Sequence, residues 1–444
     1  MLIAGLALHN TAMAQLWDIG VRGSSLDVVA AWKEALLLVA VLAAAWKVRG
    51  LPVVTTADLL AATYAVVIVL YAVMPQDWLD GNATARGELL ALRHHLLPVG
   101  AYALGRLMSG WWSTDRPGLV VALTAAGVAA IGLLDLAFIS LQAWRDSGVA
   151  SWYREQLGLD YQGLSGLPEN WVYNTGDEEN PIRRLVSTFL SPLASAYVFV
   201  VALIWVASRT LRWWTVLLGL LLYVGLLYTH TRAAVVALAV GLIVLAFAQR
   251  RFVPVVLATA ALAVSAAFFV VYPDIGPSTS YTNEELEFLR KNAQDKNAQG
   301  DPGTSSDPFS PAESSLSSHW RNLRDGVEAV LEHPQGYGLG NAGVVAKRTG
   351  VEIKGGESTY VELGIDAGLA GLTAFVLWSL AILRGLWRRE AWIAAVFVAV
   401  LLLGLQTDVI GVHWIAVAVW ALAGLALGRL RPGAEPEQEL ERSG

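Results

Sequence analysis

Residues 213–249 read WWTVLLGLLLYVGLLYTHTRAAVVALAVGLIVLAFAQ, which is two apolar runs separated by the short polar segment Thr229–Arg232. A helix needs about 20 predominantly apolar residues to cross a lipid bilayer, and a soluble protein has no use for such runs in immediate succession. The pattern therefore predicts two transmembrane helices, near residues 213–229 and 231–248, joined by a tight turn.

The composition of the whole chain has the same character. Of its 444 residues, 55% are hydrophobic and only 15% are charged. In soluble domains roughly a quarter of the residues are charged. The mean hydropathy is +0.50. The formal net charge is −6, whereas nucleic-acid-binding proteins usually carry an excess of positive charge. No nucleic-acid partner is therefore expected. Because the chain contains no cysteine, a disulfide, a thiolate metal site and a cysteine nucleophile are excluded.

Apolar runs recur along the chain and end at proline, glycine or charged residues. They predict an all-α fold, a polytopic transmembrane helical bundle of about twelve spans. The predicted spans lie near residues 2–16, 29–46, 56–74, 88–107, 118–142, 185–207, 213–229, 231–248, 253–272, 358–383, 391–407 and 412–428. The number of spans could differ by one at the N-terminus, where the first apolar run is short, or at the tight joint before Arg232.

The basic residues of the short joints predict the orientation of this bundle. They fall on one side of the twelve-span arrangement, at Lys47 and Arg49, Arg106 and Arg116, Arg209 and Arg212, Arg250 and Arg251, Arg384, Arg388 and Arg389, and Arg429 and Arg431. The positive-inside rule makes that side cytoplasmic, together with both termini. The predicted parts are N-terminal helices (1–142), a first extracytoplasmic loop (143–184), central helices (185–272), a large extracytoplasmic loop (273–357), C-terminal helices (358–430) and a cytoplasmic tail (431–444).

The large extracytoplasmic loop has two kinds of sequence. The polar tract 291–315 cannot bury enough apolar surface to offset its ordering entropy, so we expect it to be mobile. A helix should begin at Ser317 or Ser318, which are suitable N-caps, and run to about Glu332 with one apolar face. The glycine-rich segment 333–340 then ends that helix in a turn.

Several arginines lie on the extracytoplasmic side, where the positive-inside rule does not place them. These residues are Arg93, Arg183, Arg184, Arg232, Arg321 and Arg324. An arginine within or beside a span normally faces a cavity or a partner, and its guanidinium group matches phosphate oxygens bidentately. The alternative is that these side chains reach the membrane interface or pair with Asp177, Glu178, Glu179 or Asp325. The shared location of Arg184, Arg232 and Arg321 at one membrane face favours phosphate binding.

No motif of the sequence indicates a metal or nucleotide site. His94 and His95 have no carboxylate beside them at metal-ligand spacing, which favours polar packing residues over metal ligands. The glycines of 336–340 neither follow a predicted strand nor open a nucleotide-binding unit. We therefore expect neither a metal nor a cofactor.

Four segments, taken together, resemble the O-antigen ligase and O-antigen polymerase superfamily. They are RLVSTF (184–189) followed by Pro192, THTRAA (229–234), WR (320–321) leading to HPQGYGLG (333–340), and ESTYVEL (357–363) leading to Gly364, Asp366, Gly368 and Gly371. Each motif is short, but their order and spacing are similar to the family pattern over about residues 180–375.

The resemblance implies a membrane glycosyltransferase of bacterial surface-polysaccharide biosynthesis. Its partners would be membrane lipids, a polyprenyl-diphosphate-linked glycan donor and a glycan or lipid acceptor. It implies an inverting, metal-independent transfer in the inner (plasma) membrane, with the active site facing the periplasm or cell exterior. The implied catalytic residues are Glu357, Arg232 and Arg321. The implied substrate-binding residues are Arg184, Arg183, Arg93, Arg324 and Tyr337.

Glu357 departs from the family pattern, because related ligases carry His at this position and Asn where this chain has Ser358. A carboxylate can act as general base if burial raises its pKa towards neutrality, or it can anchor the acceptor. It can also be an acid that the dipole at a helix N-terminus favours.

The loss of the ligase-type histidine favours a polysaccharide polymerase, with a ligase joining O-antigen to lipid A core as the close alternative. A transporter or flippase of lipid-linked glycan is an alternative of another class. Such proteins often show matched halves with broken helices, a symmetry that we do not see in this sequence.

Overall fold

The structure is a computed structural model that describes residues 1–48, 53–173, 179–298, 314–387 and 389–428. Within these residues nearly all regular structure is helical, and the strands β1 (Val172–Tyr173) and β2 (Ile182–Arg183) form one short antiparallel pair. Residues 299–313 of the polar tract and the predicted tail 431–444 lie outside the described residues.

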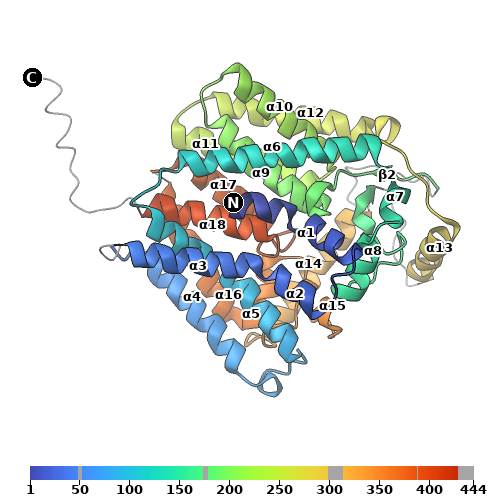
Figure 1. Ribbon diagram of the computed structural model, residues 1–444, viewed down its shortest axis with the longest axis horizontal. Coiled ribbons are helices and arrows are strands. Elements are labelled where there is room, and N and C mark those ends of the chain that lie inside the picture. The colour runs from blue at the N-terminus through green and yellow to red at the C-terminus, as the bar shows by residue number, and fades with distance from the viewer. Residues whose placement is uncertain (49–52, 174–178, 299–313, 388, 429–444) are drawn as a thin grey trace, which may run out of the picture.

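A helix lies at each of the predicted spans. The helices are α1 (Leu2–Asp18), α2 (Ser24–Ala30), α3 (Trp32–Lys47), α4 (Thr56–Val73), α5 (Ala85–Met108), α6 (Asp115–Phe138), α9 (Pro192–Ala207), α10 (Trp213–Tyr228), α11 (Arg232–Gln249), α12 (Val253–Ile275), α16 (Thr359–Leu386), α17 (Ala391–Leu403) and α18 (His413–Leu427). In Figure 1 most of these helices run in similar directions across the molecule. The shorter elements are α7 (Leu141–Arg145), α8 (Val149–Ser151), α13 (Asn283–Ala298), α14 (Ser314–Glu332) and α15 (Gly343–Thr349).

Length and composition qualify part of this set as membrane spans. Among the described residues, six helical segments are long and apolar enough to cross a membrane, and they are Ser24–Lys47, α4, α6, α11, α12 and α16. The apolar helices α9, α10, α17 and α18 are shorter. The structure therefore supports an all-α, multi-pass bundle, whereas the number of twelve spans stays a prediction.

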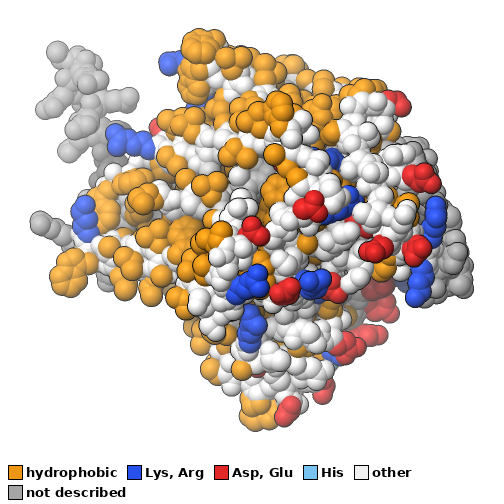
Figure 2. All heavy atoms as spheres, turned by 45° about the vertical axis from the view of Figure 1, so that its right-hand side comes forward, with side chains coloured by type: hydrophobic (Ala, Val, Ile, Leu, Met, Phe, Trp, Pro, Cys, Tyr) orange, Lys and Arg blue, Asp and Glu red, His pale blue; other side chains and the backbone are white. Residues whose placement is uncertain are grey.

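The outer helices present apolar side chains to their surroundings. On α4, Leu59, Val66 and Leu70 are each more than half exposed. Figure 2 shows hydrophobic side chains over much of the visible face, with Asp and Glu side chains gathered towards one end of it. Lipid tails are as apolar as these side chains, so this exposure has no hydrophobic cost in a bilayer.

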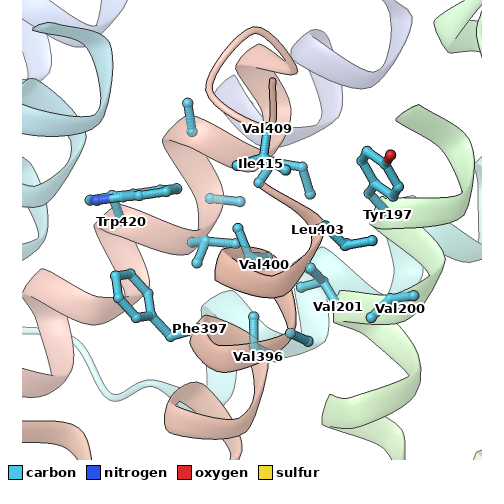
Figure 3. Close-up of a cluster of buried hydrophobic side chains, with 14 of the residues drawn as sticks. Tyr197, Val200, Val201, Val396, Phe397, Val400, Leu403, Val409, Ile415 and Trp420 are labelled. Carbon is cyan, nitrogen blue, oxygen red and sulfur yellow. The ribbon is translucent and has the colours of Figure 1, made fainter. Parts of the chain in front are cut away.

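The centre of the bundle is formed by helices that are buried on all sides. Phe397 of α17 packs against Trp420 of α18, with ring centroids 5.4 Å apart, and Tyr197 and Val200 of α9 lie on the other side of α17 in the same buried cluster (Figure 3). Helices α5 and α18 touch through their backbones, because a Cβ atom on Gly105 would lie 2.0 Å from the Ala421 carbonyl oxygen. This close contact holds α5 along the second half of α18, and His94 of α5 and His413 of α18 reach the site described below.

The predicted span 185–207 begins later than expected. Ser187 and Leu190 have φ angles of +51° and +52°, so the apolar segment before α9 is a turn. The helix starts at Pro192 after Ser191, whose side chain accepts a hydrogen bond from the Ala194 amide. Proline suits this first helical position because its missing N–H would be unpaired there in any case.

Other predicted boundaries also differ from the structure. The span 29–46 is interrupted at Ala31, and the span 118–142 ends at Phe138. The loop helix begins at Ser314, before the predicted caps, and ends at Glu332 as expected. Residues 291–298 of the polar tract belong to α13. Short polar residues can therefore continue a helix where composition alone favours a loop.

The glycine-rich turn 333–340 packs into a break in α16. Ala367 and Gly368 leave helical geometry, and Gly368 has a φ of +61°. A Cβ on Gly336 would lie 2.4 Å from the Gly368 amide nitrogen, so only glycine lets the two backbones meet. The Tyr337 amide donates to the Ile365 carbonyl across this contact (2.6 Å). The turn therefore acts as a structural clamp on α16.

Candidate functional site

Glu357 lies in the loop before α16 in a strained backbone conformation. Its φ angle is +70°, a region that costs a residue with a side chain about 1 kcal/mol or more. Hydrogen bonds hold the next residue in place, since Ser358 Oγ donates to the Gly404 carbonyl (3.0 Å). Ser358 also caps α16 by accepting a hydrogen bond from the Tyr360 amide (3.3 Å). Because Ser358 provides the cap, the side chain of Glu357 is available for other contacts.

The Glu357 carboxylate is paired with a histidine of the loop helix. His319 Nδ1 lies 2.9 Å from Glu357 Oε2, and both side chains are partly exposed. The hydrogen bond from His319 lowers the pKa of Glu357; burial raises it, and a hydrogen bond from Asn322 lowers it further. The raised pKa that a carboxylate base needs is therefore not present. The carboxylate is ionised at neutral pH and accepts the Nδ1 hydrogen, which leaves His319 Nε2 as the open position of the ring.

One face of this pair borders an apolar pocket with a volume of about 670 Å³. We call it the apolar pocket, and its lining residues include Arg232, Val236, Leu262, Phe269, Trp320 and Leu405. Val236, Leu262 and Leu405 are each roughly half exposed, so the pocket lies beside surface that faces lipid. Pockets of this size and character suit apolar ligands with a few polar anchor points.

Glu357, but not His319, also borders a second pocket of about 700 Å³, which we call the polar pocket. Its charged and histidine lining residues are Arg93, His94, Asp325, Lys347, Arg348, Lys354, Glu357, Glu362, Asp408 and His413. Gly356 and Glu357 line both pockets. The strained loop thus stands between an apolar chamber and a polar chamber.

Arg232 is placed by the turn that separates α10 from α11. Arg184 holds this turn, because its guanidinium group donates to the Thr229 carbonyl (2.8 Å) and to Thr231 Oγ1 (3.1 Å). His230 has a φ of +48°, and its ring stacks on Tyr272 with centroids 4.9 Å apart. Burial, assisted by Arg184 and Arg232, lowers the pKa of His230 to about 3. Neutral His230 therefore belongs to the packing around Arg232.

Arg183 lies away from both pockets. It pairs with Asp135 (3.4 Å) and donates to the Ile139 carbonyl, while its own carbonyl accepts a hydrogen bond from Tyr272. These contacts tie the β-strand pair to α6 and α12. The structure thus gives Arg183 a role in holding the segment between α6 and α9.

The other residues that the sequence predicts for the site lie in the polar pocket, on the loop helix and in the glycine-rich turn. Arg93 lines the polar pocket and pairs with Glu34 (3.2 Å). Arg321 and Arg324 are exposed on α14, close in sequence to the pocket-lining residues of that helix. Tyr337 stacks on His333 with ring centroids 4.0 Å apart and belongs to the glycine-rich turn. The structure therefore brings Glu357 together with Arg232 in one pocket and with Arg93 in the other.

Two histidines of α5 are paired with carboxylates, one in the loop between α17 and α18 and one on α16. His94 Nε2 lies 3.2 Å from Asp408, and His95 Nε2 lies 3.1 Å from Asp366. Asp366 also accepts the amides of Gly340 and Asn341 (3.1 Å each). The sequence analysis missed these pairs because the partners are hundreds of residues apart. In the described part of the chain, no group of three or more such side chains has a geometry that could hold a metal ion.

Sequence reasoning also missed the position of Arg348. This residue stands in α15, outside every motif, and lines the polar pocket. Its only signal in the sequence is a basic pair, Lys347-Arg348, within the loop that is predicted to be extracytoplasmic, where the positive-inside rule does not place basic residues.

Comparison with known proteins identifies one segment. Residues 216–376 match the sequence model of a family described as O-antigen ligase. This segment contains α11, α12, the loop helix, the glycine-rich turn and the start of α16, and it therefore includes Arg232, His319 and Glu357. No curated protein matches the chain.

Proposed function

Starting from the O-antigen ligase domain at residues 216–376, which places this chain in the O-antigen ligase and polymerase superfamily, we propose that it transfers glycan from a polyprenyl-diphosphate-linked donor. The protein would act in the inner membrane of a bacterium, with its site on the periplasmic or outer side. The observation that carries this proposal is the apolar pocket, whose wall holds Arg232, His319 and Glu357 together.

The apolar pocket suits the donor lipid. Its walls from α11, α12 and α17 offer aliphatic and aromatic side chains to an isoprenoid chain, and part of this surface faces lipid, which gives the donor a lateral entrance. Arg232 stands at the start of α11, where its charge and the positive end of the helix dipole both favour a phosphate group. Arg321 on the neighbouring loop helix would add a second cation to the diphosphate.

The acceptor hydroxyl needs a group that takes its proton. We assign this role to the pair His319–Glu357, with His319 Nε2 as the atom that receives the proton. Ionised Glu357 would hold the imidazole in the required tautomer and stabilise the imidazolium that forms. Glu357 thus keeps its place in the proposed catalytic group, as the residue that positions His319.

The reaction is a single displacement at the anomeric carbon of the donor sugar. The acceptor oxygen forms a bond to this carbon while the bond between the carbon and the diphosphate oxygen breaks. The hydroxyl proton passes to His319, and the bonding electrons leave with the lipid diphosphate. The growing negative charge on the leaving group is stabilised by Arg232 and Arg321. No nucleotide takes part in this step.

Two observations bear on the choice between polymerase and ligase. Glu357 in place of the ligase-type histidine favours polymerisation, in which the acceptor is itself a glycan. His319 brings an imidazole to the same place from the loop helix, which favours ligation onto a lipid acceptor as the second candidate. We propose the polymerase, because the acceptor side of the site is a polar chamber.

The proposal is tested with purified protein and lipid-linked repeat units. Wild-type protein should form longer or transferred glycan with the lipid-diphosphate donor alone, in buffer that contains a metal chelator. Arg232→Ala should abolish product formation, and Arg232→Lys should restore little of it, because an ammonium group lacks the bidentate fork. Arg154→Ala, which removes an exposed arginine paired with Glu155, is the matched control. Full activity of Arg232→Ala, or no transfer by the wild type with any repeat unit, would contradict the proposal.

A further inference from the structure

Basic side chains gather at and behind Arg93, a lining residue of the polar pocket. Lys33 and Arg93 both approach the single carboxylate of Glu34, at 3.5 Å and 3.2 Å. Arg348 lines the same pocket, and within the described residues no ion pair includes it. The charges of Lys33, Arg93 and Arg348 therefore lie close enough to interact, and Glu34 pairs with only two of them.

Arg348 itself lacks compensation. Its Nε atom is buried and has no hydrogen-bond partner among the described residues. Burial, followed by the nearby charges of Arg93 and Arg86, lowers the pKa of Arg348 to about 10. The charge of Asp27 offsets these effects in part, but Asp27 is already paired with Arg86 (3.6 Å). A partly buried cation whose Nε atom is buried without a partner has an energetic cost, and an anion at this place would reduce that cost.

The acids of the pocket do not supply this anion. Glu357 is bound to His319. Asp408 is bound to His94 (3.2 Å) and accepts the amide of Gly411 (2.8 Å). Two further acids, Glu362 and Asp325, lie on α16 and on the exposed side of α14, and neither forms an ion pair with Arg348 within the described chain. The remaining cations are occupied, since Lys347 lies over the Tyr161 ring and Lys354 binds Glu352 (2.6 Å).

We propose that Arg348 and Arg93 bind a carboxylate or phosphate group on the acceptor glycan. This inference rests on the proposed function, which places the donor lipid on the Arg232 side of Glu357 and leaves the polar pocket to the second substrate. An in-line displacement requires the acceptor to approach the anomeric carbon opposite the leaving diphosphate, and the polar pocket is a separate chamber that shares Gly356 and Glu357 with the apolar pocket. The acceptor would therefore be an acidic glycan, recognised through its anionic group by a planar, bidentate donor.

Binding to the detergent-solubilised full chain tests this proposal without any transfer reaction. The probes are an oligosaccharide that ends in a uronic acid, its carboxyl-reduced counterpart, a phosphorylated oligosaccharide and a short-chain phosphatidylglycerol. Wild-type protein should bind the two acidic oligosaccharides at least about tenfold more tightly than the reduced one, as expected for a charge-assisted hydrogen bond. Arg348→Gln should lose this preference, and the matched control Arg154→Gln should keep it.

The thermal midpoint provides a second measurement. Because Arg348 is an uncompensated cation, Arg348→Gln should unfold no earlier than wild type without ligand, and only wild type should gain stability from the acidic probe. If the glutamine variant does not fold, Arg348→Lys replaces it and should bind the acidic probes several-fold more weakly. Equal affinity of wild type for the acidic and reduced probes, unchanged affinity in the Arg348 variants, or binding of the lipid probe alone would overturn the proposal. A failure of the transfer assay would leave these binding results intact, so the two proposals fail separately.

Discussion

A substitution at Arg184 can show whether this arginine supports the fold or binds substrate. Arg184→Gln removes guanidinium hydrogen bonds to the Thr229 carbonyl (2.8 Å) and to Thr231 Oγ1 (3.1 Å). A hydrogen bond to a charged group contributes about 1.5–3 kcal/mol, so these two correspond to about 3–6 kcal/mol. The Thr229 carbonyl keeps its hydrogen bond from Thr231 Oγ1 (3.2 Å). We therefore expect the free energy of unfolding to fall by an amount near the lower end, about 3 kcal/mol.

The assay is thermal unfolding of the detergent-solubilised protein, followed by tryptophan fluorescence. A loss of this size should lower the midpoint by several degrees, while Arg154→Gln should leave it unchanged. Binding of the lipid-diphosphate donor is measured below the midpoint of the variant. If Arg184→Gln has the same thermal midpoint as the wild type but no longer binds the donor, Arg184 contacts the diphosphate and the structural role is refuted.

Three further predictions concern pH, the glycine-rich turn and topology. Burial lowers the pKa of His230 from its ordinary 6.5 to about 3 in the folded protein. Between pH 6.5 and pH 3 the unfolded chain therefore binds more protons than the folded chain. The thermal midpoint should fall as the pH falls through this range. A flat profile in wild type, or an equal slope in His230→Asn, would contradict the buried neutral imidazole. Gly336→Ala places a Cβ atom 2.4 Å from the backbone of α16 at a φ of +76°. The substitution should lower the free energy of unfolding by about 3 kcal/mol. A variant with the thermal midpoint of the wild type would contradict the role of the glycine-rich turn as a clamp on α16. Single cysteines at Ser280 and Thr210 should label from opposite sides of intact cells, and labelling of both from outside would end the proposed orientation.

The helices could be predicted from the sequence because lipid imposes a simple rule. Apolar runs such as 213–228 and 232–249 become helices with nearly the expected bounds, since only a helix satisfies its backbone within one apolar segment. The rule fails where apolar residues form turns. The segment before Pro192 is apolar but carries two residues with positive φ, and their backbone geometry depends on contacts with distant helices.

The candidate site could be predicted only in part. The resemblance pointed to Arg232 and Glu357, and the structure places both along one pocket. The resemblance did not show that Arg184 supports the turn before Arg232, because a side chain that binds carbonyls and one that binds phosphate have the same sequence signal. The partnership of His319 with Glu357 and the isolation of Arg348 depend on long-range packing that spacing along the chain does not encode.

The central claim is that His319 and Glu357 act as one unit, with Glu357 at the boundary between the two pockets. Single-turnover transfer is measured for His319→Gln, Glu357→Gln and the double variant over a range of pH. A general base contributes about 10²–10⁴-fold, so His319→Gln should lose that much. The double variant should lose no more, because residues that act as a unit are not additive. Glu357→Gln should retain a slower reaction, since the imidazole has lost the carboxylate that positions it. Losses that multiply in the double variant would contradict the account.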